Sequence, residues 1–222
     1  MAVLTLETLK DMSEVETYLL KGNAHLEAIG FTDHGVRHSN LVAKIARNIL
    51  LRLDYPEREA ELAAIAGYLH DLGNVVSRWM HGQMGAMMAW QLLREAGMPA
   101  HEVATVVGAI GSHDPEDISE PVNNVAAAVI LADKSDVHRS RVRNPDVSQF
   151  DIHDRVNYAV QRSFVKVDEA KHTITLQLTV DTTISPVMDY FEIFLARMVM
   201  CRRAAEFLHC SFELSINDVR LL

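Results

Sequence analysis

Apolar residues recur at the three- and four-residue spacing of amphipathic helices through the first part of the chain. Residues 5–30 fit two helical pieces, and the second opens at Ser13 with the spacing of a capping box. Gly30 is expected to end this pair, and a loop capped by Asp33 or Thr32 follows. The chain therefore begins as a helical protein.

The next two predicted helices place polar groups beside buried faces. The apolar positions between residues 41 and 50 fall on one helical face, and His38 lies at the start of that face. Pro56 then opens a helix over residues 57–71, for which Gly73 is the expected C-cap. This helix ends at two adjacent residues, His70 and Asp71, which supply an imidazole and a carboxylate.

Three more helices are expected over residues 81–95, 99–110 and 122–142. The first carries methionine, leucine and tryptophan on more than one side, which favours a central position. Residues 125–132 are too apolar for a surface helix, so Asp133 should lie at the buried end of its element.

The pattern changes after Pro145 and predicts a second unit. Residues 163–167 and 173–180 alternate apolar with polar side chains around a short turn, which is typical of a β-hairpin. A helix over residues 186–208 and a strand over residues 212–216 follow, giving a small antiparallel sheet with the helix on one face. We therefore predict a mainly α fold with a small C-terminal α+β unit (antiparallel hairpin, helix, strand), divided into residues 1–145 and 146–222.

Composition and charge restrict the partners and the cellular compartment that we expect for this protein. The chain has 222 residues, 49% of them hydrophobic, and a formal charge of −9, which argues against a nucleic-acid polymer or an acidic membrane as partner. Its two cysteines are too few for a disulfide scaffold, which favours a reducing compartment. The N-terminus lacks the order of a signal peptide, and no apolar run reaches membrane-spanning length. We expect a cytoplasmic protein.

Four residues at helix starts or ends have the chemistry of metal ligands, namely His38, His70, Asp71 and Asp133. Two imidazoles and two carboxylates form a nitrogen and oxygen set that suits iron, manganese or zinc better than calcium. Each residue alone also fits a hydrogen-bonded core histidine or a surface carboxylate. Adjacent His and Asp arise by chance, and we read His113-Asp114 and His153-Asp154 as such cases.

The order of these four residues along the chain is a more specific signal than any one of them alone. His38, then His70-Asp71, then Asp133 resembles the H…HD…D signature of the HD-domain metal-dependent phosphohydrolases, over roughly residues 30–142. The resemblance implies an all-helical bundle, the HD domain, with metal ligands supplied by separate helices. The C-terminal unit lies outside the resemblance.

Further histidines resemble those of family members with two metals. His81 opens one predicted helix and His113 follows the next, as in that branch. The resemblance implies that His38, His70, Asp71 and Asp133 hold a first ion, that His81 and His113 hold a second, and that Asp71 bridges them. The GYP motif of the cyclic-dinucleotide phosphodiesterases is absent.

Positive charge follows the last ligand of the set. Lys134, Arg139, Arg141 and Arg143 are candidates for binding a substrate phosphate. Cations are also favoured at a solvated helix end, which is the alternative interpretation. His34 precedes His38 by four residues and is a candidate ligand or proton carrier, together with Asp71 and Lys134 as catalytic residues.

Our leading hypothesis is a phosphohydrolase that uses metal-activated water on a nucleotide or a small phosphorylated metabolite. It implies one or two divalent transition-metal ions, iron, manganese or zinc, with Mg²⁺ as a further candidate. The alternatives are a di-iron oxygenase of the HD type and a non-catalytic module for nucleotide binding or assembly. The C-terminal unit is a candidate homodimer interface or substrate wall.

Overall fold

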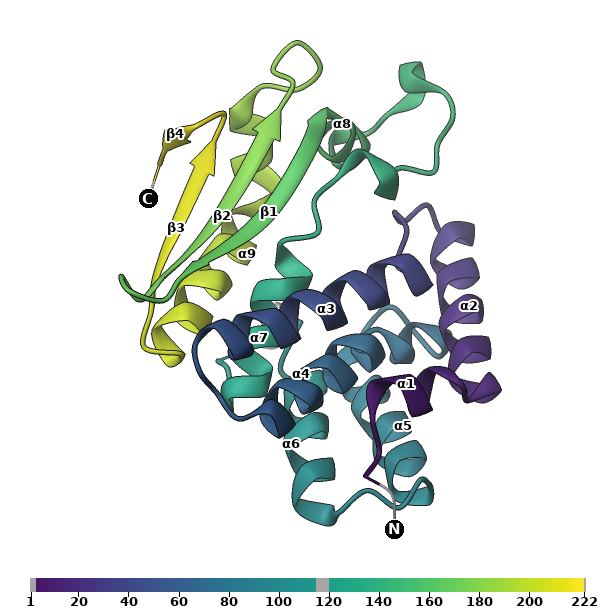
Figure 1. The fold of residues 1–222 in the computed structure, drawn as a ribbon. Coiled ribbons are helices and arrows are strands. Elements are labelled where there is room, and N and C mark those ends of the chain that lie inside the picture. The colour runs from purple at the N-terminus through teal and green to yellow at the C-terminus, as the bar shows by residue number, and fades with distance from the viewer. Residues whose placement is uncertain (1–2, 115–119, 222) are drawn as a thin grey trace.

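The computed structural model describes residues 3–114 and 120–221 (Figure 1). The helices of these residues lie mostly in one bundle, with a four-stranded sheet and α9 beside it. They are α1 (Leu6–Lys10), α2 (Ser13–Ala28), α3 (Val36–Arg52), α4 (Glu57–Leu69), α5 (His81–Glu95), α6 (Ala100–Gly111), α7 (Asn124–Lys134), α8 (Ile152–Ala159) and α9 (Val187–Phe207). The mainly helical fold is confirmed.

Two helices form the centre of the bundle, α4 and α7. Every residue from Leu62 to Leu69 is buried, as is the stretch from Val125 to Ala132. Gly67 permits a close approach to α3, because a Cβ there would lie 3.1 Å from the Cα of Ala43. The apolar composition of α4 and α7 thus explains why the other helices pack around these two.

The predicted central position of α5 is wrong. Its boundaries match the prediction, but Met87 is 62% exposed and Trp90 is 42% exposed. Only one face of α5 packs against α6 and the turn over Leu72–Val75. Hydrophobicity on several sides of a helix therefore did not indicate burial in this case.

Several predicted helix ends also differ from the structure. Ser13 is the first residue of α2, after Met12 at the N-cap, and α3 starts at Val36 after Gly35, an N-cap with no side-chain hydrogen bond. Gly73 lies in a 3-10 turn, and α7 ends at Lys134 rather than near residue 142. Gly30, with φ of 85°, follows α2 in the left-handed conformation that a C-terminal glycine supplies.

The C-terminal strands form one mixed sheet in the order β1 (Val160–Asp168), β2 (Thr173–Val180), β3 (Ser211–Ile216) and β4 (Val219–Arg220). The β1–β2 hairpin is antiparallel as predicted, but β2 and β3 are parallel, so the sheet is not antiparallel throughout. The connection through α9 accounts for this, because a helix that returns along the sheet brings the next strand in parallel to the previous one.

Helix α9 packs against both the sheet and α7, and α8, which the sequence did not predict, packs against α9 (Figure 1). The buried apolar core continues from the bundle into these elements. A domain boundary between residues 145 and 146 stays a prediction. No helix of the described chain is long and apolar enough to cross a membrane.

Candidate metal centre

Side chains from three helix ends meet at the first group of predicted ligands. The Nε2 of His38 lies 3.2 Å from the Nε2 of His70 and 3.3 Å from the Oδ1 of Asp133. The Oδ2 of Asp71 lies 3.6 Å from the Nε2 of His38 and 3.4 Å from that of His70. Four residues from three segments far apart in sequence thus present one nitrogen or oxygen each to a single point.

The second group lies next to the first and shares Asp71. The Nε2 of His81 is 3.1 Å from the Nε2 of His113 and 3.3 Å from the Oδ1 of Asp71. The rings of His70 and His113 lie 4.9 Å apart between centroids, so the two groups are continuous. Asp71 directs one carboxylate oxygen to each of them.

Hydrogen bonds at the opposite ring nitrogens fix how these histidines point. The Nδ1 atoms of His70, His81 and His113 each donate to the carbonyl oxygen three residues earlier, at 2.8, 3.0 and 2.6 Å. The Nδ1 of His38 donates to Asp136 at 2.7 Å. Because these acceptors fix the hydrogen on Nδ1, Nε2 is the nitrogen available to a ligand.

The donor set fits divalent transition-metal ions. The paired Nε2 atoms lie 3.1–3.2 Å apart, and once they are deprotonated each can bind an ion placed between them. The Oδ2 of Asp71 is buried and faces the Nε2 atoms of His70 and His38 at 3.4 and 3.6 Å. His38, His70 and Asp133, and likewise His70, Asp71 and His113, present ligand atoms within 4.8 Å of one another. The geometry can therefore hold an ion in either of these two three-residue sets, which share His70.

Buried carboxylates raise the pKa of two of the histidines. Burial lowers the pKa of His70, but the charge of Asp71 and hydrogen bonds to Asp133 and Asp71 outweigh it and raise the pKa to about 10. For His81, hydrogen bonds to Asp114 and Asp71 outweigh burial and raise the pKa to about 9. Burial and the positive charges of His70 and His81 lower the pKa of His113 to about 3.

We expect the apparent affinity for a divalent metal to rise with pH through the neutral range. His70 and His81 carry protons below about pH 9 in the metal-free protein, and these protons must leave before Nε2 binds an ion. Each displaced proton should give up to about tenfold in affinity per pH unit. Calorimetric titration with Mn²⁺ in buffers of different ionisation enthalpy measures the release. An affinity that is flat between pH 6 and 8 would contradict it.

Two carboxylates that support the ligands were not predicted. Asp136 accepts from the Nδ1 of His38 and pairs with Arg37 at 2.9 Å, and Asp114 lies 2.8 Å from the Nδ1 of His81. The hydrogen bond to His38 and the charge of Arg141 hold the pKa of Asp136 low despite its burial. His113-Asp114, which we read as a chance dipeptide, thus lies inside the centre.

Replacing Asp136 with asparagine is expected to weaken metal binding about 10- to 100-fold, because carboxylates that orient ligating histidines have effects of that size. Metal titration followed by fluorescence or calorimetry measures the loss. Asp33→Asn is the matched control, since Asp33 pairs with the same Arg37 but not with His38. Equal affinities of both variants and the parent protein would refute the orienting role.

The predicted phosphate-binding cations divide into two pairs. Lys134 lies 2.6 Å from the Oδ2 of Asp133 and, like Arg141, lines the metal pocket. Arg139 stacks over Tyr158, and Arg143 bonds Asn23 and pairs with Glu27, so neither of these arginines lines the metal pocket. The structure therefore does not bring Arg139 and Arg143 to the site.

Two arginines that the sequence did not predict line the metal pocket instead of Arg139 and Arg143. Arg78, three residues before His81, and Arg197, in the middle of α9, both line the metal pocket. No sequence motif marks either residue. Only the packing of α9 on α7 brings Arg197 to the centre, which is why a motif within residues 30–142 could not reveal it.

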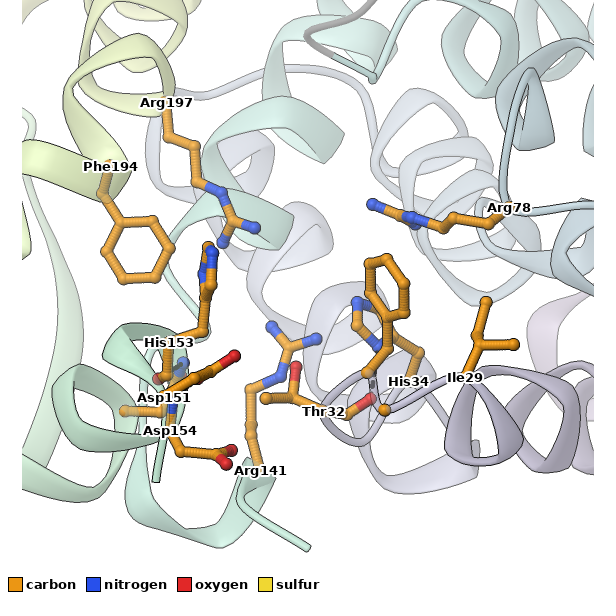
Figure 2. Close-up of a pocket in the computed structure, with 13 residues that line it drawn as sticks. Ile29, Thr32, His34, Arg78, Arg141, Asp151, His153, Asp154, Phe194 and Arg197 are labelled. Atoms are coloured by element: carbon orange, nitrogen blue, oxygen red, sulfur yellow. Dashed lines mark hydrogen bonds between the residues drawn. The ribbon is translucent and has the colours of Figure 1, made fainter. Parts of the chain in front are cut away.

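A cavity of about 360 Å³ adjoins the metal pocket and shares His34, Arg78, Arg141 and Arg197 with it (Figure 2). The Nδ1 of His34 donates to the carbonyl of Thr32 at 2.7 Å, leaving Nε2 as an acceptor. Burial and the charge of Arg141 hold the pKa of His34 well below its usual value. His34 is therefore a neutral residue that lines both spaces, and its ring lies edge-on to the ring of the ligand candidate His38, 5.5 Å between centroids.

Comparisons with known proteins agree with the motif. Residues 35–138 match the model of the HD domain family, which confirms the resemblance drawn from His38, His70-Asp71 and Asp133. The uncharacterized protein MJ1020 of Methanocaldococcus jannaschii is 25% identical over 182 residues, covering 71% of this chain and 69% of its own length.

Among solved structures, a predicted HD superfamily hydrolase from an uncultured Thermotogales bacterium is 23% identical. It covers 61% of this chain and 75% of its own, with a TM-score of 0.46.

Proposed function

We propose that the protein is a metal-dependent phosphohydrolase that cleaves a phosphate ester of a nucleotide or another small phosphorylated metabolite. The observation that carries the proposal is the pair of ligand groups joined by Asp71, next to a cavity edged by arginines. His38, His70, Asp71 and Asp133 would hold one ion, and His81, His113 and Asp71 the other. Iron, manganese and zinc fit this donor set, and Mg²⁺ fits it less well.

Bound divalent ions supply a water of lowered pKa and positive charge for the phosphoryl oxygens. Lys134 neutralises the outer oxygen of Asp133 and so holds Oδ1 toward the histidines. Arg141 presents a guanidinium to the space between the metal pocket and the cavity. The Nε2 of His34 is free to accept a hydrogen bond from a substrate there, and the low pKa of His34 makes it a positioning group rather than a proton donor.

The experiment is a phosphate-release assay on the purified chain with nucleoside monophosphates and sugar phosphates. We expect activity with Mn²⁺ or Fe²⁺ and its loss on chelation. Turnover that requires molecular oxygen would instead support the oxygenase alternative, which uses the same histidine-rich ligand chemistry. Purified protein that carries no metal and hydrolyses nothing would support a non-catalytic binding module.

A further inference from the structure

Three arginine side chains converge between the metal pocket and the adjoining cavity. Figure 2 shows Arg197 entering from α9, Arg78 from the opposite wall and Arg141 from below, all directed toward the same region. All three residues line both spaces. A ligand that occupies the cavity and reaches the metal pocket must therefore pass between them.

The charges of two of these arginines are incompletely matched by protein groups. Arg197 forms no hydrogen bond or ion pair with any residue in the described ranges, and its guanidinium stacks on Phe194 at 4.4 Å. Arg141 is 3% exposed and pairs with Asp136 at 3.8 Å, but its Nη2 has no hydrogen-bond partner there. Because a guanidinium stays charged at all physiological pH values, an unpaired one in a pocket favours an anion.

Acidic and polar side chains also line this cavity. Helix α8 and its N-cap contribute Asp151, His153, Asp154 and Asn157 to the lining. Asp154 is half-buried; burial together with the charge of Asp151 raises its pKa, against a smaller opposing effect of His153 and of a backbone hydrogen bond from Asp151. A carboxylate accepts hydrogen bonds only, so its complement is a hydroxyl or amino group.

We propose that the C-terminal segment supplies the specificity of this pocket, with Arg197 binding the phosphate of a phosphomonoester and Asp154 accepting hydrogen bonds from hydroxyl or amino groups of its organic part. This inference rests on the proposed function, because it assumes that the phosphate lies toward the metal pocket. The ligand class is a sugar phosphate or nucleotide, which a cavity of about 360 Å³ can enclose. A simple aryl or alkyl phosphate lacks the groups that Asp154 would bind.

The test is calorimetric binding of inorganic phosphate, phenyl phosphate and ribose 5-phosphate to the full chain after chelation, so that turnover is absent. We expect ribose 5-phosphate to bind best. Arg197→Gln should weaken all three by about tenfold or more, which is the scale of charge-assisted hydrogen bonds. Asp154→Asn should weaken ribose 5-phosphate and leave inorganic phosphate unchanged.

Matched controls come from the same helix. Arg202 and Glu192 are exposed on α9 and line neither space, so Arg202→Gln and Glu192→Gln should bind as the parent does. Arg197→Lys keeps the charge and provides the test if the glutamine variant does not fold. We expect it to lose less binding affinity than Arg197→Gln. Binding that is unchanged in both Arg197 variants, or absent in the parent chain, would overturn the inference.

The two proposals fail separately. Binding that depends on Arg197, in a protein that hydrolyses no phosphate ester when loaded with metal, would refute the hydrolase and leave the pocket assignment standing. Hydrolysis that is insensitive to Arg197→Gln would refute the pocket assignment alone.

Discussion

Replacing Asp71 with alanine is expected to remove both metal ions and to reduce turnover by roughly 1,000-fold, the equivalent of several kcal/mol of transition-state stabilisation. The reason is geometric, because Asp71 directs Oδ2 toward His38 and His70 and Oδ1 toward His81. Its removal takes one ligand and one negative charge from each group. Elemental analysis of protein purified without chelator, with kinetics on the same sample, measures both effects.

His113→Ala is the informative comparison, since His113 belongs to the second group, where its Nε2 lies 3.1 Å from that of His81. It should lower the metal content from two ions to one per chain. Asp146→Asn, a change at an exposed capping residue of a remote turn, should keep both ions. Two ions retained in Asp71→Ala would show that Asp71 does not bridge.

Replacing Gly73 with alanine is expected to destabilise the protein by about 3 kcal/mol, the upper range for an overpacked core. A Cβ at this position would overlap the carbonyl oxygen of His81 and lie 2.5 Å from the backbone nitrogen of Gly85. Both atoms are backbone, so α5 must move, and His81 moves with it. Urea denaturation measures the stability, and metal analysis should show that the second ion is lost first.

Gly111→Ala is the control for this change. The nearest atom to a Cβ there is the Cβ of Ala86 at 3.8 Å, an ordinary contact, so stability should stay the same or rise slightly. If the free energy of unfolding of Gly73→Ala equals that of Gly111→Ala, the close packing of the turn on α5 does not hold His81 in place.

Helical periodicity was sufficient to predict most of the bundle, because a helix that buries one face carries apolar residues at a regular spacing of three and four in its sequence. The boundaries of α5 matched the prediction, and the hairpin of β1 and β2 followed from alternation. The parallel pairing of β2 with β3 could not be read in this way, since alternation marks a strand but not its neighbour's direction. The exposure of Met87 was missed because apolar side chains also cover protein surfaces.

The candidate ligands could be named from sequence because their order forms a motif. Groups that act through a ligand have no such motif, so Asp136 and Asp114 emerged only from their bonds to His38 and His81. Arg197 comes from an element outside the segment that matches the HD domain family and reaches the centre only through the packing of α9 on α7. His153-Asp154, taken as chance, likewise lines the cavity.

The proposed reaction is water attack at phosphorus, and isotope transfer tests it most directly. The metal-loaded chain would be incubated with a nucleoside 5′-monophosphate in ¹⁸O-labelled water without molecular oxygen, and the released phosphate analysed by mass spectrometry. The proposed function predicts one labelled oxygen in the phosphate. Product formed only with molecular oxygen, or unlabelled phosphate, would contradict it.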